Sequence, residues 1–235
     1  MNPLNAKGWR TQSPGKPYSV QRVQAPRRHH ADSLRFELRK GESYLSDDGL
    51  SSFRSEIRAG GHMPMNSEKY YGFSLYLPAN FPIENKRLVL AQWWAPTKKK
   101  LGEVDRSPAL QFRFAEGKLS IRLRYSELRV VKDPEKYHEE KLLEIKDFPL
   151  GLWSDFVVHT KWSSGSDGLI EAWWNGKRVV NYRGQTDYKD NVGPVFKFGL
   201  YRDDTPHTYV SYMSEVRIGD SFDAVEPSRV RPAGK

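Results

Sequence analysis

Short segments in which apolar and polar residues alternate recur along most of the chain, and this period-two pattern is the strongest constraint on the fold. The segments cover residues 33–39, 70–77, 87–94, 108–114, 119–125, 154–162, 169–174, 177–182, 195–201 and 208–218. Turn signals separate them, including Asn175-Gly176, a dipeptide typical of two-residue hairpins. Helices are expected only near 134–141 and 47–52, and no alternation of strands with helices appears. The sequence therefore predicts an all-β sandwich of the jelly-roll type.

The composition of the 235 residues fits one globular domain. Aromatic residues reach 13%, which excludes a disordered chain, and no apolar run is long enough for a membrane span. There is no cysteine, which excludes thiol catalysis and disulfides. The pattern predicts a flexible basic arm over residues 1–17, a single domain over 18–225 and a tail over 226–235. No signal peptide pattern opens the chain.

The net charge of +9 is concentrated near the start of the chain. Residues 1–40 hold nine Lys or Arg against two acidic residues, a balance of +7, which leaves only +2 for the remaining 195 residues. A nucleic-acid partner would need a continuous basic stripe on the folded part, so this balance does not favour one.

Strand periodicity places several cations on one face of the predicted sheet. Arg113 lies on one strand of a predicted hairpin, and Arg122 and Arg124 lie on the other. Three neighbouring arginines form either a solvated surface or a groove that binds carboxylates or sulfates through bidentate contacts. Arg54 and Arg58 alternate with Glu56 along another strand, as either an ion-pair ladder or a carboxylate site.

The segment 195–202 carries the most informative side chains. Lys197 and Tyr201 share a face, and Gly199 between them leaves room for a ligand to approach the backbone. A lysine ammonium close to a phenol would favour the phenolate, so this tyrosine is suited to proton transfer, although both side chains could also be ordinary surface residues. Gln92 and Trp94 lie on one face of the strand 87–94, as a hydrogen-bond donor and a stacking platform for a sugar ring, or as structural residues.

The histidines carry weaker signals. His62 follows a glycine-rich turn and is a candidate base, and His159 shares a face with Lys161, but isolated histidines are more often incidental. No set of histidines has the spacing of a metal site. A retaining glycoside hydrolase would need two carboxylates about 5 Å apart, at alternate positions of a strand, and the sequence offers only Glu103 and Asp105 in a predicted loop.

The ordered motifs FRSEIR, YYGFSLYLP, VLAQWW, GLWSDFVVHTKWS, GLIEAWWNGKRVVNYRG and PVFKFGLYR, which cover roughly residues 18–220, resemble the heparin lyase I and glucuronan lyase group of polysaccharide lyases. The resemblance implies a concanavalin A-like jelly roll with a groove across its concave sheet. It implies β-elimination of an anionic, uronate-containing polysaccharide, with a glucuronan as the expected substrate. A non-catalytic lectin that binds acidic polysaccharide is the alternative.

The resemblance matches Gln92, Lys197 and Tyr201 to active-site positions, and we add His62 as a candidate catalytic residue. The expected substrate-binding residues are Arg54, Arg58, Trp94, Arg113, Arg122, Arg124, His159 and Arg202. Where the family often reads Gln-x-His, this chain has Trp94 in the histidine position, which leaves the general base open. The chemistry requires no cofactor, although a structural Ca²⁺ is compatible with it. We expect the protein to be secreted or periplasmic, because the substrate is a polymer, and we expect a monomer.

Overall fold

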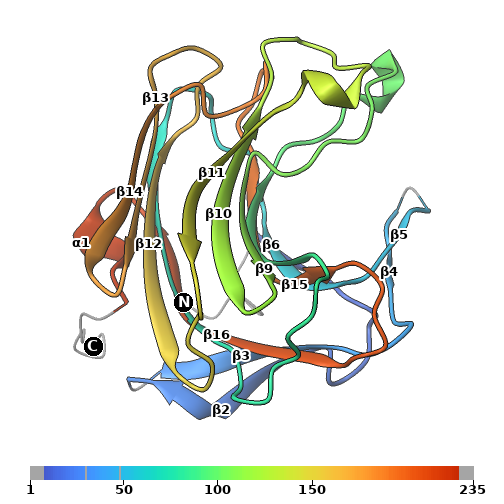
Figure 1. Ribbon diagram of the computed structural model, residues 1–235, viewed down its shortest axis with the longest axis vertical. Coiled ribbons are helices and arrows are strands. Elements are labelled where there is room, and N and C mark those ends of the chain that lie inside the picture. The colour runs from blue at the N-terminus through green and yellow to red at the C-terminus, as the bar shows by residue number, and fades with distance from the viewer. Residues whose placement is uncertain (1–7, 30, 48, 228–235) are drawn as a thin grey trace.

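The chain folds into two antiparallel seven-stranded sheets packed face to face, in a computed structural model that describes residues 8–29, 31–47 and 49–227 (Figure 1). Sheet A contains, in spatial order, β1 (Trp9–Gln12), β6 (Arg54–Ala59), β15 (Val195–Arg202), β8 (Leu88–Trp94), β9 (Leu110–Ala115), β10 (Lys118–Tyr125) and β11 (His138–Ile145). Sheet B contains β14 (Lys177–Gly184), β13 (Gly168–Trp174), β12 (Trp153–Lys161), β7 (Glu68–Tyr76), β16 (Tyr209–Gly219), β3 (Ala31–Leu38) and β2 (Val20–Arg28). The predicted all-β jelly roll is confirmed.

Large apolar side chains from both sheets fill the space between them. Phe73 and Phe156 of sheet B pack against Phe112 of sheet A, with ring centroids 5.4 and 5.2 Å from it. Trp93 and Phe196, on neighbouring strands of sheet A, complete this aromatic core and are fully or almost fully buried. Because strand side chains alternate between faces, the residues between these core positions face away from sheet B.

Short elements lie outside the two sheets. They are the hairpin β4 (Tyr44–Leu45) and β5 (Ser51–Ser52), the 3-10 helices η1 (Lys99–Leu101) and η2 (Pro134–Lys136), and the helix α1 (Phe222–Val225). The hairpin and the 3-10 helices lie on the side of sheet A that faces away from sheet B (Figure 1). No helix in the described part of the chain is long and apolar enough to cross a membrane.

Three local predictions are wrong. The helix expected near residues 134–141 is a single 3-10 turn followed by strand β11, and the described residues of 47–52 hold strand β5 in place of a helix. The arm predicted over residues 1–17 enters sheet A as β1, because Trp9 packs edge-on against Phe198 with ring centroids 5.7 Å apart. Residues 1–7 and 228–235 of the predicted arm and tail lie outside the described residues.

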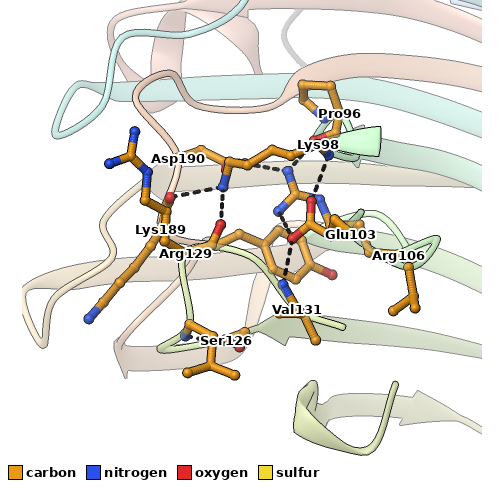
Figure 2. Close-up of polar contacts among 12 residues, drawn as sticks. Pro96, Lys98, Glu103, Arg106, Ser126, Arg129, Val131, Lys189 and Asp190 are labelled. Carbon is orange, nitrogen blue, oxygen red and sulfur yellow. Dashed lines mark hydrogen bonds and ion pairs between the residues drawn. The ribbon is translucent and has the colours of Figure 1, made fainter. Parts of the chain in front are cut away.

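A charged cluster ties three loops together at the end of sheet A where β8 stops (Figure 2). The Lys98 ammonium donates to the backbone carbonyls of Arg129 and Lys189, at 2.6 and 3.0 Å, and pairs with Asp190. The Arg106 guanidinium also pairs with Asp190, with Nη2 2.6 Å from the carboxylate, and the side chains of both residues are almost fully buried. The loop that leads into β15 is thereby fixed to the loops that follow β8 and β10.

Candidate active site

The outer face of sheet A, which we call the polar face, carries one row of polar side chains across all seven strands. Strand register places these residues directly opposite one another in pairs along the row Arg10, Arg58, Lys197, Gln92, Gln111, Arg122 and Lys141. Directly opposed residues in antiparallel strands point to the same side, so these side chains share one surface. The structure thus brings Gln92 and Lys197 together, as the sequence predicted.

A bulge in β8 sets the orientation of Gln92. The pairing of β8 with β9 shifts between Val89 and Ala91. Val89 is paired with Arg113, and Gln92 with Gln111, so both β8 residues lie on the polar face although an odd number of steps separates them. Trp93 remains in the core, and Trp94 returns to the polar face, where its ring lies beside Lys197. Strict alternation therefore does not hold along this strand.

Glu56 is the buried anion at the centre of this face. Its side chain is fully buried, and its Oε1 accepts a hydrogen bond of 2.5 Å from Nε2 of Gln92. Its Oε2 lies 3.5 Å from the Arg54 guanidinium and accepts no hydrogen bond. A carboxylate can only accept here, so it fixes which end of the Gln92 amide carries the donors. Glu56 is part of the alternating segment FRSEIR, but no sequence signal predicts its contact with Gln92.

Lys197 is held without a direct partner. Among the described residues no hydrogen bond or ion pair reaches its Nζ, which lies 4.4 Å from the centroid of the Trp94 ring. Burial lowers the pKa of its ammonium group to about 8, Glu56 opposes this effect, and the positive charges of Arg54 and Arg58 add to it. A cation that is buried but unpaired favours the arrival of an anion.

Tyr201 lies two positions beyond Gly199 on β15 and is opposite Arg54 in the neighbouring strand. The guanidinium carbon of Arg54 is 4.4 Å from the centroid of its ring, and that of Arg87 is 4.7 Å away. Gly199 has φ +130°, and a Cβ there would meet the Ser55 carbonyl oxygen at 2.4 Å, so the glycine is required by the backbone. No sequence signal identified Arg87, which directly precedes β8.

Trp94 is surrounded by candidate site residues. The Arg58 guanidinium lies 5.8 Å from its ring centroid, and the His62 ring lies 6.4 Å from it. Nδ1 of His62 is 3.0 Å from the carbonyl oxygen of Gly193, in the loop fixed by the charged cluster of Figure 2. If Nδ1 donates to this carbonyl, Nε2 carries the free lone pair of the neutral ring.

Burial and a neighbouring cation both destabilise the charged form of Arg58. Burial lowers the pKa of its guanidinium, and the nearby charge of Arg10 lowers it further. Its Nε is buried and makes no hydrogen bond. Like Lys197, Arg58 is therefore a cation whose surroundings would improve if an anion bound beside it.

The three arginines predicted from the hairpin differ in their surroundings. Arg122 and Arg124 are paired with Glu139 of β11, with Nη1 of Arg122 2.6 Å from the carboxylate. The Arg113 guanidinium has no hydrogen-bonded partner among the described residues, and the side chain lines a pocket with Asn85 and Lys118. Burial lowers the pKa of the Arg113 guanidinium, and the charge of Arg122 adds to this effect.

The structure does not bring the last two predicted binding residues to the polar face. His159 lies on β12 of sheet B, where its ring nitrogens are each 3.0 Å from carboxylates of Glu171 and Glu68, and its ring stacks on Tyr70. Arg202 is 1% exposed and donates to the backbone carbonyls of Asp203 and Arg39. It follows Tyr201 directly, so strand alternation turns it toward the interior. Both expectations of substrate contact are corrected.

Comparisons with known proteins agree with this architecture. An endo-β-1,4-glucuronan lyase from the fungus Trichoderma reesei matches with a TM-score of 0.77 at 19% identity, over 95% of this chain and 96% of that one. Alginate lyase A1-II′ matches with a TM-score of 0.57 at 11% identity, over 91% and 95%. Alginate lyase vAL-1 from Chlorella virus matches with a TM-score of 0.55 at 13% identity, over 91% and 93%.

Matches at these identities show a shared fold. No curated protein sequence matches the chain. The model of one protein family, described as polysaccharide lyase, matches residues 1–217, which is most of the sequence. The chain therefore belongs to the polysaccharide lyase family.

Proposed function

We propose that the protein cleaves a 4-linked uronate polymer, of the glucuronan type, by β-elimination on the polar face of sheet A. The observation that carries this proposal is the grouping of an amide, an unpaired ammonium and a phenol, Gln92, Lys197 and Tyr201, on two adjacent strands. Neighbouring strands are about 4.8 Å apart, so the seven-strand row spans roughly 29 Å, enough for several sugars of an extended chain.

The first requirement of the reaction is to neutralise the uronate carboxylate. The C5 proton is weakly acidic, and negative charge builds on the carboxylate as this proton leaves. One N–H of the Gln92 amide donates to Glu56, so the second N–H is available to the substrate. Arg54 or Arg58 supplies the positive charge beside it. A positioned donor of this kind contributes on the order of 3 kcal/mol to the transition state.

The second requirement is proton transfer. We assign Tyr201 as the acid that protonates the leaving O4 and, in a syn elimination, as the base that removes the C5 proton. The proton then moves from C5 to the phenolate oxygen and on to O4, while the C4–O4 bond breaks and the C4–C5 double bond forms. His62 is the alternative base, because its ring lies beside Trp94 at the same site. Lys197 holds the substrate charge.

The remaining polar side chains suit flanking sugars. Trp94 offers a ring for stacking between Lys197 and Arg58. Arg113 offers a guanidinium with no partner among the described residues, so it is our first choice for a flanking carboxylate. Arg122 and Arg124 already share Glu139, so they contact substrate only by exchanging that partner.

The elimination needs no redox cofactor, because the electrons of the C5–H bond become those of the new double bond. The described residues include no group of three or more His, Asp or Glu side chains arranged to hold a metal ion. One set of oxygen donors of the kind that Ca²⁺ binds, two loop carbonyls with Asp190, is already occupied by the Lys98 ammonium. These oxygen atoms therefore suit the ammonium group of Lys98 better than a structural Ca²⁺.

A lectin that binds acidic polysaccharide without cleaving it is the second candidate, because Trp94 occupies the position of the usual base. We also propose that the protein acts as a secreted or periplasmic monomer, since a polymeric substrate is met outside the cytoplasm.

One assay separates these functions. The protein is incubated with glucuronan, heparin, alginate and hyaluronan, and the ultraviolet absorbance of the new C4–C5 double bond is followed. We expect the signal with wild type on glucuronan and its loss in Tyr201→Phe, with Tyr212→Phe on sheet B as the matched control. Saturable binding without absorbance would instead identify a lectin, and new reducing ends without absorbance a hydrolase.

A further inference from the structure

Arg87 and Asp203 form a clamp at the ends of the two central strands, β8 and β15. Nη2 and Nε of Arg87 donate to Oδ1 of Asp203 at 2.8 and 3.1 Å. The backbone is tied as well, since the Asp203 amide donates to the Arg87 carbonyl at 3.0 Å. Four torsions of a long side chain are thus restrained by one carboxylate, which fixes where the guanidinium lies.

The position so fixed is against the ring of Tyr201. The guanidinium carbon of Arg87 is 4.7 Å from the ring centroid, inside the ~6 Å range of a cation–π contact. Burial lowers the pKa of Arg87, but its interactions with Tyr201 and Asp203 outweigh burial, and the net change is upward. Arg87 therefore remains charged while it contacts the phenol.

Arg54, on the other neighbouring strand, also contacts this ring but has other partners. Its Nε donates to Ser52 Oγ at 2.7 Å, and its Nη1 lies 3.5 Å from Glu56. In the proposed mechanism the substrate carboxylate competes for this same charge. Arg87 is held by Asp203 at the strand ends, so its charge stays beside Tyr201 when substrate binds.

We infer that Arg87, held by Asp203, is a positioning residue for Tyr201 that stabilises the phenolate required to take the C5 proton. This inference rests on the proposed function of Tyr201 as the base. No histidine stands at the position of Trp94, and in the syn elimination assigned to Tyr201 one phenol both accepts and returns the proton. A fixed neighbouring cation favours the phenolate before transfer and the loss of the proton to O4 afterwards.

The test compares Arg87→Gln and Arg87→Lys with wild type, and with Arg22→Gln as a control, since Arg22 lies on edge strand β2 of sheet B paired with Asp32. Two properties are measured from neutral to alkaline pH: kcat on glucuronan, and the phenolate absorbance of Tyr201, taken as the difference between each protein and its own Tyr201→Phe variant. Thermal melting confirms that the variants fold.

In Arg87→Gln we expect kcat at neutral pH to fall on the order of 10-fold, the scale of a partly desolvated cation–π contact. Activity should recover as the pH rises, the phenolate should form at higher pH than in wild type, and KM should change little. Arg87→Lys should restore part of both properties, and Arg22→Gln should match wild type.

An unchanged phenolate titration and an unchanged pH profile would show that the clamp only closes the strand ends, and would overturn the inference. A rise in KM alone would overturn it too, because it would make Arg87 a substrate contact. If no uronan yields a double bond with wild type, the proposed function fails, and the phenolate titration still decides whether Arg87 acts on Tyr201.

Discussion

Replacing Lys197 by methionine should stabilise the fold at neutral pH while it removes activity. The Lys197 side chain is 3% exposed, and burial lowers the pKa of its ammonium group from 10.5 to about 8, against the opposing charge of Glu56. One pKa unit corresponds to 1.36 kcal/mol, so the lowered pKa of Lys197 corresponds to ~3 kcal/mol. At pH 7 the charged Lys197 therefore destabilises the native state by this amount relative to the unfolded state. A methionine fills similar space without this cost.

The sign of the pH dependence follows from the same pKa values. Between about pH 8 and 10.5 the unfolded chain still binds the Lys197 proton, whereas the native chain has lost it. The unfolded state therefore binds more protons in this window, and wild-type stability rises with pH. Lys197→Met lacks this contribution, so its advantage of ~3 kcal/mol at pH 7 should shrink steadily and disappear by about pH 10.5.

The measurement is urea unfolding followed by circular dichroism, at several pH values from 7 to 10.5. Taking the difference between variant and wild type cancels the titration of the tyrosines, which both proteins share. Lys177→Met is the matched control, since Lys177 is exposed on β14 and its replacement should give no pH-dependent difference. A difference for Lys197→Met that stays constant over this range would refute the argument that Lys197 is charged and unpaired in the native state.

Three further predictions follow from single contacts. Glu56→Gln removes the charged acceptor that orients Gln92, so kcat on glucuronan should fall on the order of 10²-fold with little change in KM, and full activity would contradict this role. Gly199→Ala places a Cβ 2.4 Å from a backbone carbonyl oxygen, in a residue whose φ is +130°. The free energy of unfolding should therefore fall by ~3 kcal/mol and the melting temperature with it, and an unchanged melting temperature would contradict the close approach. Lys98→Met leaves two loop carbonyls without their donor and Asp190 with Arg106 as its one remaining partner in the cluster, so the free energy of unfolding should drop by about 3 kcal/mol. A chelator should leave wild-type melting unchanged, and a loss of stability on chelation would reveal a bound metal ion.

Strands such as β10 and β15 could be predicted from sequence because apolar residues of the core alternate with polar residues of the outer face. The alternation in 195–201 placed Lys197 and Tyr201 on one face, and the structure agrees. Strand β11 could not be predicted in this way. Its sequence HEEKLLEI is rich in residues that favour helices, and it is a strand because it pairs with β10 at the sheet edge.

The parts of the site that could not be predicted depend on contacts between residues far apart in the sequence. Glu56 and Gln92 are 36 positions apart and meet only because β15 lies between their strands and contributes Gly199, which has no side chain, at that point. Arg87 reaches Tyr201 through a contact with Asp203, 116 positions away, at the ends of two strands. The sequence does not indicate that His159 lies on sheet B, because periodicity assigns a residue to a face of its strand but not the strand to a sheet.

The two outer faces of the sandwich differ in how their charges are satisfied, and this difference supports the proposed site without reference to any relative. On sheet B several cations have nearby anions, as in Arg28 with Asp155 and Arg178 with Glu171. On the polar face of sheet A, the buried polar atoms that lack hydrogen bonds include Gln12 Oε1, Glu56 Oε2, Arg58 Nε and Gln111 Oε1. Each such atom destabilises the apo fold, so a surface that gathers several of them beside an unpaired lysine is organised for a ligand that supplies the missing partners. A uronate supplies both kinds of partner, because its carboxylate accepts from the cations and amides while its hydroxyls donate to the free oxygens.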